Sequence, residues 1–372
     1  MKPVLGFLTR FYKQTDKPLL LTCVAVSLLS GVLLMGVNAA GFCNDRVVQV
    51  QFIATVMGVV GACIVANLDY EMLAHLWKLY APLIALVNLY TAFFGDIREG
   101  TSNRSWLDLG VTSVQPSEFL KIALILTLAY HLSQVKDTLN TPRTLVPVLI
   151  HGFGAVGIIL LQGDLGVAII MAAIVIIMLF MAGLSRKLMA IGVAGIAALA
   201  PFAWFFLLSQ YHKNRILALF YPDQFALNEA HQQQAGLLSI GSGQIFGIGI
   251  FSESHNYVPE MYNDFIFTFL GESMGFVGCF LLILAYVIIC GRILAAALQC
   301  RSDLGKYICI GVFAMLVSQI VINISMCLML MPVIGVTLPL MSAGGSSVVT
   351  VYAGLGLVLS VYAESNKNMF AS

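Results

Sequence analysis

The sequence is poor in charged residues. Only 10% of its 372 residues are charged, whereas soluble domains carry roughly a quarter, and 59% are hydrophobic, with a mean hydropathy of +0.93. This composition excludes an ordinary soluble domain and indicates a polytopic membrane protein. The formal net charge of +1 also argues against a nucleic-acid partner, which would bind a basic face.

The sequence patterns of paired cysteines, of a leader cleavage site and of a nucleotide-binding loop are missing as well. The eight cysteines show no CxxC pair and no metal-ligand spacing, and nearly all lie in apolar runs, so we interpret them as small apolar side chains. No A-x-A-like cleavage site precedes the first apolar run, which predicts that this run stays as an anchor. The glycine-rich stretch 239–249 lacks Walker A spacing.

What the sequence does contain is a series of apolar runs of about 20 residues, the length that crosses a bilayer core as a helix. They predict an all-α polytopic membrane protein in which residues 1–372 form a single membrane domain. We expect ten transmembrane helices, at about 18–38, 48–67, 73–95, 117–134, 145–161, 165–184, 187–209, 265–290, 306–329 and 334–362. The longest polar interval, 210–264, lies between the seventh and eighth helices, and long loops of this kind commonly carry function.

Lysine and arginine are distributed unevenly over the two sets of loops, and basic loops are retained on the cytoplasmic side. With the N-terminus inside, the outer segments hold only Arg46, Arg98, Arg104, Lys213 and Arg215. The inner segments then hold Lys2, Arg10, Lys13, Lys17, Lys136, Arg143, Arg186, Lys187, Arg292, Arg301, Lys306 and Lys367. This distribution predicts that both termini lie inside, and that the loop 210–264 and a second polar segment, 96–116, lie outside together.

Charged residues occur where the fourth helix begins. Glu118 stands near the helix N-terminus behind Pro116, an arrangement typical of ordinary capping. Lys121 follows three residues later, on the same helical face. Because a charge at membrane depth is costly, this pair either neutralises itself at the interface or lines a polar cavity that receives a charged head group.

Three other segments allow a structural and a functional interpretation. Asp164 lies in an almost loopless turn, which a simple hairpin would explain. The glycines of 239–249 either cradle a phosphate through backbone N–H groups or form a re-entrant turn. Breakers interrupt the last predicted helix at 332–347, so its backbone either lines a cavity or packs tightly against neighbouring helices.

Several motifs, taken together and in this order, resemble the SEDS family (shape, elongation, division and sporulation). Its RodA and FtsW proteins are bacterial peptidoglycan glycosyltransferases with ten membrane spans. The motifs are RSWLDLG and QPSEFLKIALI within 104–125, QGDLGVAI at 162–169, SIGSGQIFGIG at 239–249, VPEMYNDFIFTFLGESMGFVG at 258–278 and MPVIGVTLPLMSAGGSS at 331–347. The resemblance covers about residues 15–362, and the short termini favour a RodA-like over an FtsW-like protein.

The resemblance implies a site, a substrate and a partner. It makes Asp264 the catalytic candidate and Trp106, Glu118 and Lys121 substrate-binding candidates. The substrate would be lipid II, a disaccharide-pentapeptide on undecaprenyl pyrophosphate, and the partner a class B penicillin-binding protein, a transpeptidase, both at the cytoplasmic membrane. We add as substrate-binding candidates Arg215, Gln232, Glu260, Ser342 and Ser346. The chain departs from the family pattern at Gly163 (proline), Ala235 (glutamine), Ile248 (lysine) and Ala343 (tyrosine).

Polymerising lipid II requires a base near a sugar 4-hydroxyl and positive charge near the departing pyrophosphate. Asp264 would serve as that base in an inverting displacement, which needs no second carboxylate nucleophile, or it would hold a divalent cation; no cofactor is firmly implied. Lys121 and Arg215 are the preferred cations for the pyrophosphate, and Glu260 either orients the site or is a solvated acid. The alternative functions are a flippase or transporter of the lipid-linked precursor, since broken helices also mark transporters, and a scaffold in wall synthesis.

Overall fold

The structure is a computed structural model, and it describes residues 15–97, 103–108, 110, 113–225 and 230–370. Four basic residues used for the orientation, Lys2, Arg10, Lys13 and Arg98, lie outside these ranges. Within them the chain is mostly helical, and nine helices are long and apolar enough to cross a membrane, with one shorter apolar helix, Leu165–Met181. The prediction of a ten-helix polytopic protein is therefore confirmed.

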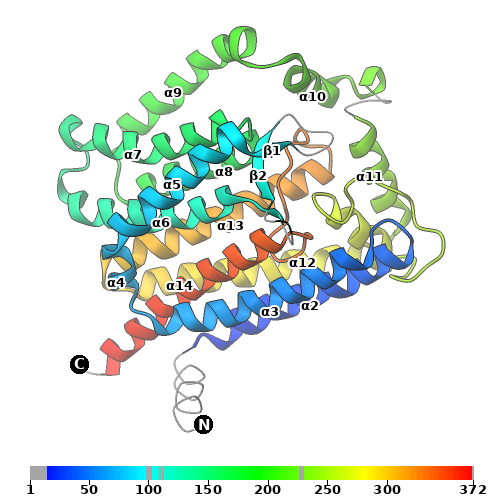
Figure 1. The fold of residues 1–372 in the computed structure, drawn as a ribbon, viewed down its shortest axis with the longest axis horizontal. Coiled ribbons are helices and arrows are strands. Elements are labelled where there is room, and N and C mark those ends of the chain that lie inside the picture. The colour runs from blue at the N-terminus through cyan, green and yellow to red at the C-terminus, as the bar shows by residue number, and fades with distance from the viewer. Residues whose placement is uncertain (1–14, 98–102, 109, 111–112, 226–229, 371–372) are drawn as a thin grey trace.

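The ten helices form one bundle whose axis runs across the view of Figure 1. They are α2 (Lys17–Ala39), α3 (Asp45–Asn67), α5 (Trp77–Phe94), α6 (Pro116–Val135), α7 (Pro142–Leu161), α8 (Leu165–Met181), α9 (Arg186–Phe202), α12 (Ile266–Gln299), α13 (Asp303–Cys327) and α14 (Gly345–Phe370). Shorter helices are α4 (Tyr70–His75), α10 (Gln210–Phe220) and α11 (His231–Ser242), with the turns η1 (Lys136–Thr138), η2 (Ala203–Leu207) and η3 (Pro222–Phe225).

Local sequence explains where several helices begin. The side chains of Asp16, Asn44 and Asp164 accept hydrogen bonds from the backbone N–H groups of the first turns of α2, α3 and α8. Proline occupies the first turn of α6 and of α7, where its missing N–H leaves no bond unmade. These caps fix the boundaries that hydropathy alone leaves open.

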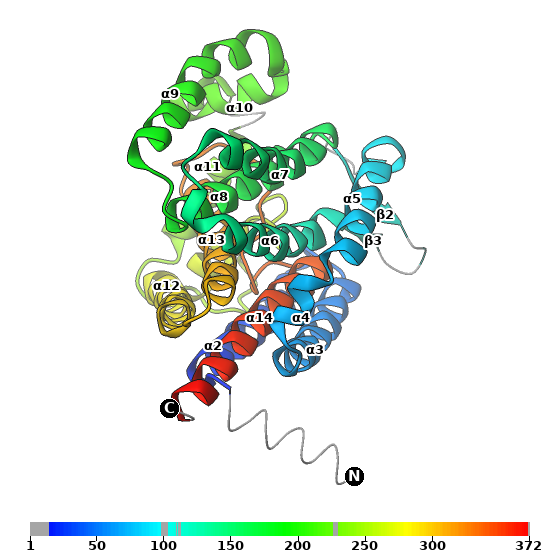
Figure 2. The ribbon, with the colours of Figure 1, turned by 90° about the vertical axis from the view of Figure 1, so that its left-hand side faces the viewer.

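Burial separates the helices into a central and a peripheral set. In α6, α13 and α14 more than half of the most apolar window is buried, whereas α9 has no buried residue among those whose side chains are described. Figures 1 and 2 both show α9 standing apart from the helices beneath it. The core of the protein therefore lies around α6, α13 and α14.

Three local features differ from the sequence expectations. The tenth helix begins at Gly345 instead of at residue 334, because residues 328–344 are non-helical around Pro332 and Pro339. The third span is divided at Leu76 into α4 and α5. The outer segment after α5 forms a small antiparallel sheet in the order β1 (Asp96–Ile97), β2 (Arg104–Asp108) and β3 (Ser113–Val114).

The glycine-rich stretch 239–249 packs against a break in α12 at Gly275, whose φ is +64°. A helix break frees backbone groups, and this stretch pairs with four of them. Phe276 N donates to Gln244 O, Val277 N to Ile245 O, Ile248 N to Glu272 O and Gly249 N to Ser273 O. A Cβ added at Gly243 or Gly247 would run into the α12 backbone. Close packing therefore accounts for these glycines as a re-entrant turn.

Ion pairs and hydrogen bonds join the helix ends on the side opposite the sheet. Asp16, at the start of α2, accepts two bonds from the guanidinium of Arg292 at 2.6 and 2.9 Å. Lys136 donates to Asp303 at 2.8 Å between α6 and α13. The start of α2 and the end of α14 lie at this same end of the bundle (Figure 1), as an even number of spans requires.

Candidate functional site

Asp264 lies directly before α12 and is half-buried. Its backbone oxygen accepts a hydrogen bond from Nδ2 of Asn323 at 2.7 Å, and the same amide donates to Val336 O at 2.6 Å. Gly335 has a φ of +70°, and a Cβ built there would lie 3.6 Å from Oδ2 of Asp264. The carboxylate therefore faces the non-helical segment 328–344, and Asn323 holds the two together.

The turn that leads into Asp264 contains backbone strain. Glu260 has a φ of +57°, which is uncommon for a residue with a side chain and clusters at functional sites. Its backbone oxygen accepts from Asn263 N and Phe265 N, and its carboxylate accepts from Asn263 Nδ2 at 2.6 Å. Gln232 donates to the preceding carbonyl, Pro259 O, at 2.7 Å. In this structure Glu260 and Gln232 both shape the turn that carries Asp264.

Arg215, from α10, reaches the same non-helical segment. Its Nη1 donates to Val333 O at 2.7 Å, two residues before Gly335. The segment is also held by Gln233, whose amide donates to Met326 O and Met331 O, both at 2.8 Å. Arg215 thus bonds a carbonyl two residues before the glycine that faces Asp264.

Glu118 and Lys121 form a buried ion pair at the start of α6. Nζ of Lys121 lies 2.9 Å from Oε1 of Glu118, with the side chains 0% and 4% exposed, while Oε2 of Glu118 has no hydrogen-bond partner. Asp164 accepts from Val167 N at 3.0 Å and from Nε2 of Gln115 at 3.1 Å. Burial raises the pKa of Asp164 above its ordinary value, and the neighbouring Glu118 carboxylate raises that pKa further. Two acids and one lysine therefore share this region.

The start of α14 connects this charged region with Asp264. Ser346 accepts from Gln115 N at 3.3 Å, next to the first turn of α6. Ala343 N donates to Tyr262 O at 2.8 Å, two residues before Asp264. Ser342 is buried, and its hydroxyl accepts from Leu338 N at 2.8 Å. The structure thus brings Asp264 and the Glu118 region to opposite sides of one connecting segment, at one end of the bundle.

Trp106 lies on β2, half-buried, at the same end of the bundle. Its strand pairs with β1 and β3, and Arg104 N donates to Gln162 O at 2.9 Å. That bond attaches the strand to the turn before Asp164. The expectation that segments 96–116 and 210–264 face the same compartment stays a prediction.

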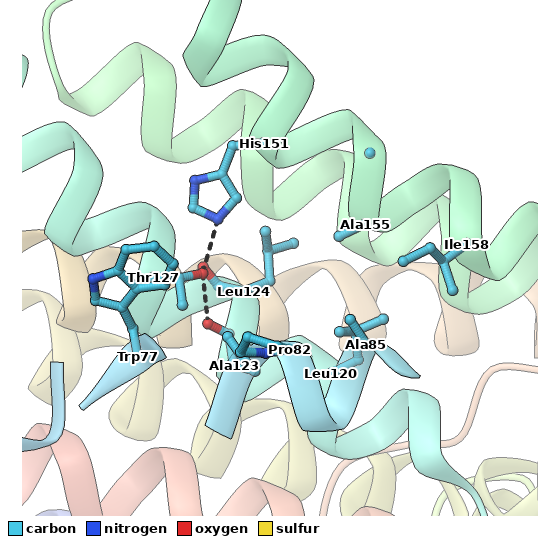
Figure 3. Close-up of a pocket in the computed structure, with 12 residues that line it drawn as sticks. Trp77, Pro82, Ala85, Leu120, Ala123, Leu124, Thr127, His151, Ala155 and Ile158 are labelled. Carbon is cyan, nitrogen blue, oxygen red and sulfur yellow. Dashed lines mark hydrogen bonds between the residues drawn. The ribbon is translucent and has the colours of Figure 1, made fainter. Parts of the chain in front are cut away.

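A separate apolar cavity of about 280 Å³ lies between α5, α6 and α7 (Figure 3). Thr127 accepts from or donates to His151 Nε2 at 3.0 Å and donates to Ala123 O at 2.8 Å. The α6 residues that line the cavity, Leu120, Ala123, Leu124 and Thr127, share one helical face, whereas Glu118 and Lys121 lie on another. The cavity is therefore not part of the charged region.

Sequence reasoning missed the residues that hold the site in place. Gln233 and Asn323 bond backbone carbonyls around the non-helical segment, and Gln51 donates to Ser30 and accepts from Gly344 N. For Gln51 and Asn323 the available signal was an amide inside an apolar run, since such an amide needs a partner, whereas Gln233 lies in a polar stretch that carries no such signal. Where that partner lies depends on tertiary structure.

Comparison with known proteins identifies the family. The family described as "Cell cycle protein" (FTSW_RODA_SPOVE) matches residues 17–367. The chain belongs to this family. It is 31% identical over 365 residues to Stage V sporulation protein E of Bacillus subtilis (strain 168), a match that covers 94% of this chain and 98% of that protein. It is 30% identical over 356 residues to Peptidoglycan glycosyltransferase MrdB of Escherichia coli (strain K12), covering 93% of each.

Solved structures of family members share the fold. A chain of the structure described as "Structural coordination of polymerization and crosslinking by a peptidoglycan synthase complex" superposes with a TM-score of 0.78 at 29% identity, covering 94% of this chain and 98% of that one. Thermus thermophilus RodA gives a TM-score of 0.69 at 27% identity, covering 94% and 96%. The protein is accordingly a multi-pass protein of the cytoplasmic membrane. Because its relatives include sporulation, RodA and FtsW proteins, the RodA-like assignment stays a prediction.

Proposed function

We propose that this protein polymerises lipid II into glycan strands at the outer face of the cytoplasmic membrane. The observation that carries the proposal is the position of Asp264: a half-buried carboxylate on a strained turn, facing a non-helical segment at the end of the bundle. Membrane-depth backbone without helical bonding occurs where it lines a protein interior or a cavity. Relatives with the same architecture are named peptidoglycan glycosyltransferases.

In the proposed reaction Asp264 removes the proton from the 4-hydroxyl of one sugar. The oxygen then attacks the anomeric carbon of a second lipid-linked unit, and undecaprenyl pyrophosphate leaves with its electron pair. This single displacement inverts the α-linked pyrophosphate to a β-linked polymer. A base within hydrogen-bond reach of the hydroxyl contributes typically 10² to 10⁴ in rate.

Cations are available for the departing pyrophosphate. Arg215 bonds Val333 O through Nη1, and a planar guanidinium presents its N–H donors in a fork that matches phosphate oxygens. Lys121 is fully buried beside Glu118, so a head group would reach it only by entering the region between α6 and α14. We therefore place Arg215 ahead of Lys121 for direct contact with pyrophosphate, and we assign Lys121 an electrostatic role in the charged region of Glu118 and Asp164.

We also propose that both termini face the cytoplasm and that 210–264 lies outside. The basic residues Lys136 and Arg292 stand at the end of the bundle opposite Asp264, where positively charged loops are retained. A transporter would need its site to open to both faces, whereas the candidate residues gather at one end. The outward location supports chemistry on lipid II that has already crossed the membrane.

A transpeptidase is the proposed partner, by analogy with the synthase complex that couples polymerisation to crosslinking. Asp264 would either act as the base or hold a divalent cation. Among the described residues no group of three or more His, Cys, Asp or Glu side chains could hold an ion, but Mg²⁺ is often bound by one carboxylate together with substrate phosphates. Asp264 with pyrophosphate would meet that pattern.

The test is glycan polymerisation from purified lipid II by the purified protein with its transpeptidase. Asp264→Asn removes the base without changing shape, and we expect polymer to fall at least about 100-fold. Glu260→Gln is the matched control, because an amide at that position still accepts from Asn263. Parallel reactions with a chelator separate a base from a metal ligand. Undiminished polymer from a folded Asp264→Asn protein would overturn the assignment.

A further inference from the structure

Glu272 and His255 form a buried pair that the site described above does not include. Glu272 lies in α12, about two turns after Asp264, and His255 lies in the extended chain that leads towards Asp264. Nδ1 of His255 is 3.0 Å from Oε2 of Glu272, and both side chains have 0% exposure. Two ionisable side chains buried against each other need an explanation.

Hydrogen-bond partners fix how many protons this pair carries. Nε2 of His255 is 3.2 Å from the carbonyl oxygen of Ile250, and a carbonyl only accepts, so Nε2 bears a hydrogen. Nδ1 faces a carboxylate oxygen of Glu272, so a second proton lies between these two atoms, whichever of them holds it. The pair is therefore neutral as a whole, which removes the cost of an uncompensated buried charge.

The other carboxylate oxygen of Glu272 accepts hydrogen bonds from the chain that leads to Asp264. Oε1 accepts from Asn256 N at 3.0 Å, from Asn256 Nδ2 in a short bond, and from Oγ of Ser242 at 3.2 Å. The carbonyl oxygen of Glu272 accepts from Ile248 N at 2.9 Å. One residue of α12 thus binds the glycine-rich segment and the chain that approaches Asp264.

These bonds close a loop that contains Asp264. From Asn256, which bonds Glu272, the chain passes through the strained turn at Glu260 to Asp264 and then runs along α12 to Glu272. A loop tied at its base has fewer conformations than an open one, and a catalytic group must be held within about 0.5 Å of its productive position. The bond between Asn256 and Glu272 is the tie that closes it.

We propose that Glu272 is a positioning residue for Asp264 and that His255 is its proton-sharing partner. Glu272 acts through the Asn256 backbone and takes no part in the reaction itself. The role assigned to Asp264 rests on the proposed function, whereas the closure of the loop does not.

The test compares Glu272→Ala with Glu272→Gln. Alanine removes both bonds between Glu272 and Asn256 and leaves Nδ1 of His255 without its partner, while the bond from Nε2 to Ile250 O stays. Glutamine restores them, because its oxygen accepts from Asn256 and its amide donates to Nδ1 of a neutral His255. We expect Glu272→Ala to lower kcat about 10- to 100-fold with KM for lipid II within about twofold, and Glu272→Gln to recover kcat to within about threefold.

The matched control breaks an ion pair with one buried member at the opposite end of the bundle. The Asp16 side chain is 2% exposed and pairs with the partly exposed Arg292, so Asp16→Ala reports what removal of a buried carboxylate partner does to the fold in general. We expect it to leave kcat of the folded fraction unchanged. A loss of kcat in Asp16→Ala as large as in Glu272→Ala would overturn the proposal.

A second measurement is independent of activity. In Glu272→Ala the amide hydrogens of Asn263 and Phe265, which bond Glu260 O, should exchange faster than in the wild type, and in Glu272→Gln they should not. Wild-type kcat and wild-type exchange in Glu272→Ala would overturn the positioning role. A Glu272→Gln protein with normal exchange but no activity would also overturn it, since Glu272 would then act in the chemistry. Should Asp264→Asn retain activity, the proposed function fails, while the exchange result still decides whether Glu272 closes the loop.

Discussion

Replacing Lys121 by methionine separates the stability of the charged region from its function. The change keeps a flexible, unbranched side chain of similar volume and removes the ammonium charge together with its hydrogen-bond donors. Glu118, which is 3% exposed and has one oxygen without a hydrogen-bond partner among the described residues, is then left without its cation. Removing one member of a buried pair typically costs about 3–5 kcal/mol, because the remaining charge stays desolvated.

Proton uptake sets an upper limit to that cost. If the abandoned carboxyl is instead neutralised, an ordinary glutamate requires about 4 kcal/mol at pH 7 and about 1 kcal/mol at pH 5. We therefore expect Lys121→Met to lower the free energy of unfolding by about 4 kcal/mol at pH 7 and by about 3 kcal/mol less at pH 5. A lost hydrogen bond alone would cost only about 0.6 kcal/mol in a membrane and would not depend on pH.

The assay is thermal and denaturant unfolding of the purified protein in detergent, at pH 5 and at pH 7, with lipid II polymerisation measured in parallel. The double variant Glu118→Gln with Lys121→Met removes both charges, so we expect its stability to return close to that of the wild type while polymerisation stays low. Lys136→Met is the control, since its partner Asp303 and Lys136 itself are exposed and such pairs contribute little.

Two results would refute this reasoning. A double variant as unstable as Lys121→Met would mean that the loss does not come from an unpaired carboxylate. Equal destabilisation at pH 5 and pH 7 would mean that no proton uptake follows the substitution, so that packing and not charge accounts for the effect.

Two further predictions follow from single residues. Because burial raises the pKa of Asp164 above its usual 3.8, the folded state binds the proton more tightly than the unfolded state, and stability should fall as pH rises through the folded pKa. Asp164→Asn can still cap α8, and it should flatten that part of a pH series of unfolding midpoints. An unchanged slope would contradict the assignment. Gly247→Ala should destabilise the folded protein by about 2–4 kcal/mol, because the φ of Gly247 is +80° and a Cβ would run into the α12 backbone. Gly241→Ala is the control, since a Cβ at Gly241 meets no described atom within 4 Å. Equal melting temperatures of the two variants would count against the packing argument.

The apolar runs predicted the spans well because the requirement is local. A helix satisfies its own backbone hydrogen bonds, and the bilayer sets its length, so composition over about 20 residues suffices. The prediction was wrong at the tenth helix, which begins later than hydropathy suggested because the segment around Pro332 and Pro339 is not helical. It also missed the small sheet, because strands of two to five residues carry almost no periodic signal.

The motifs located Asp264, Glu118 and Lys121, but their surroundings depend on contacts between distant parts of the chain. Asn323 and Gly335 face Asp264 only because α13 and the segment after it fold back on the start of α12. The glycines of 239–249, ambiguous in the sequence, pair with the broken backbone at Gly275. No local pattern contains that pairing.

The sequence by itself therefore determined the membrane-spanning class, the number of helices and the family, because hydropathy and motif residues are properties of short segments. Only the tertiary structure decided how the site is held. The loop closed by Glu272 and the hydrogen bond between Gln115 and Ser346 each connect residues on different elements. Glu118 and Lys121 lie on one helix, so the sequence already placed them on one face, and only the packing around α6 decided that both are buried. Buried polar groups must find partners wherever the packed helices place them, and that requirement becomes specific only when the bundle has formed.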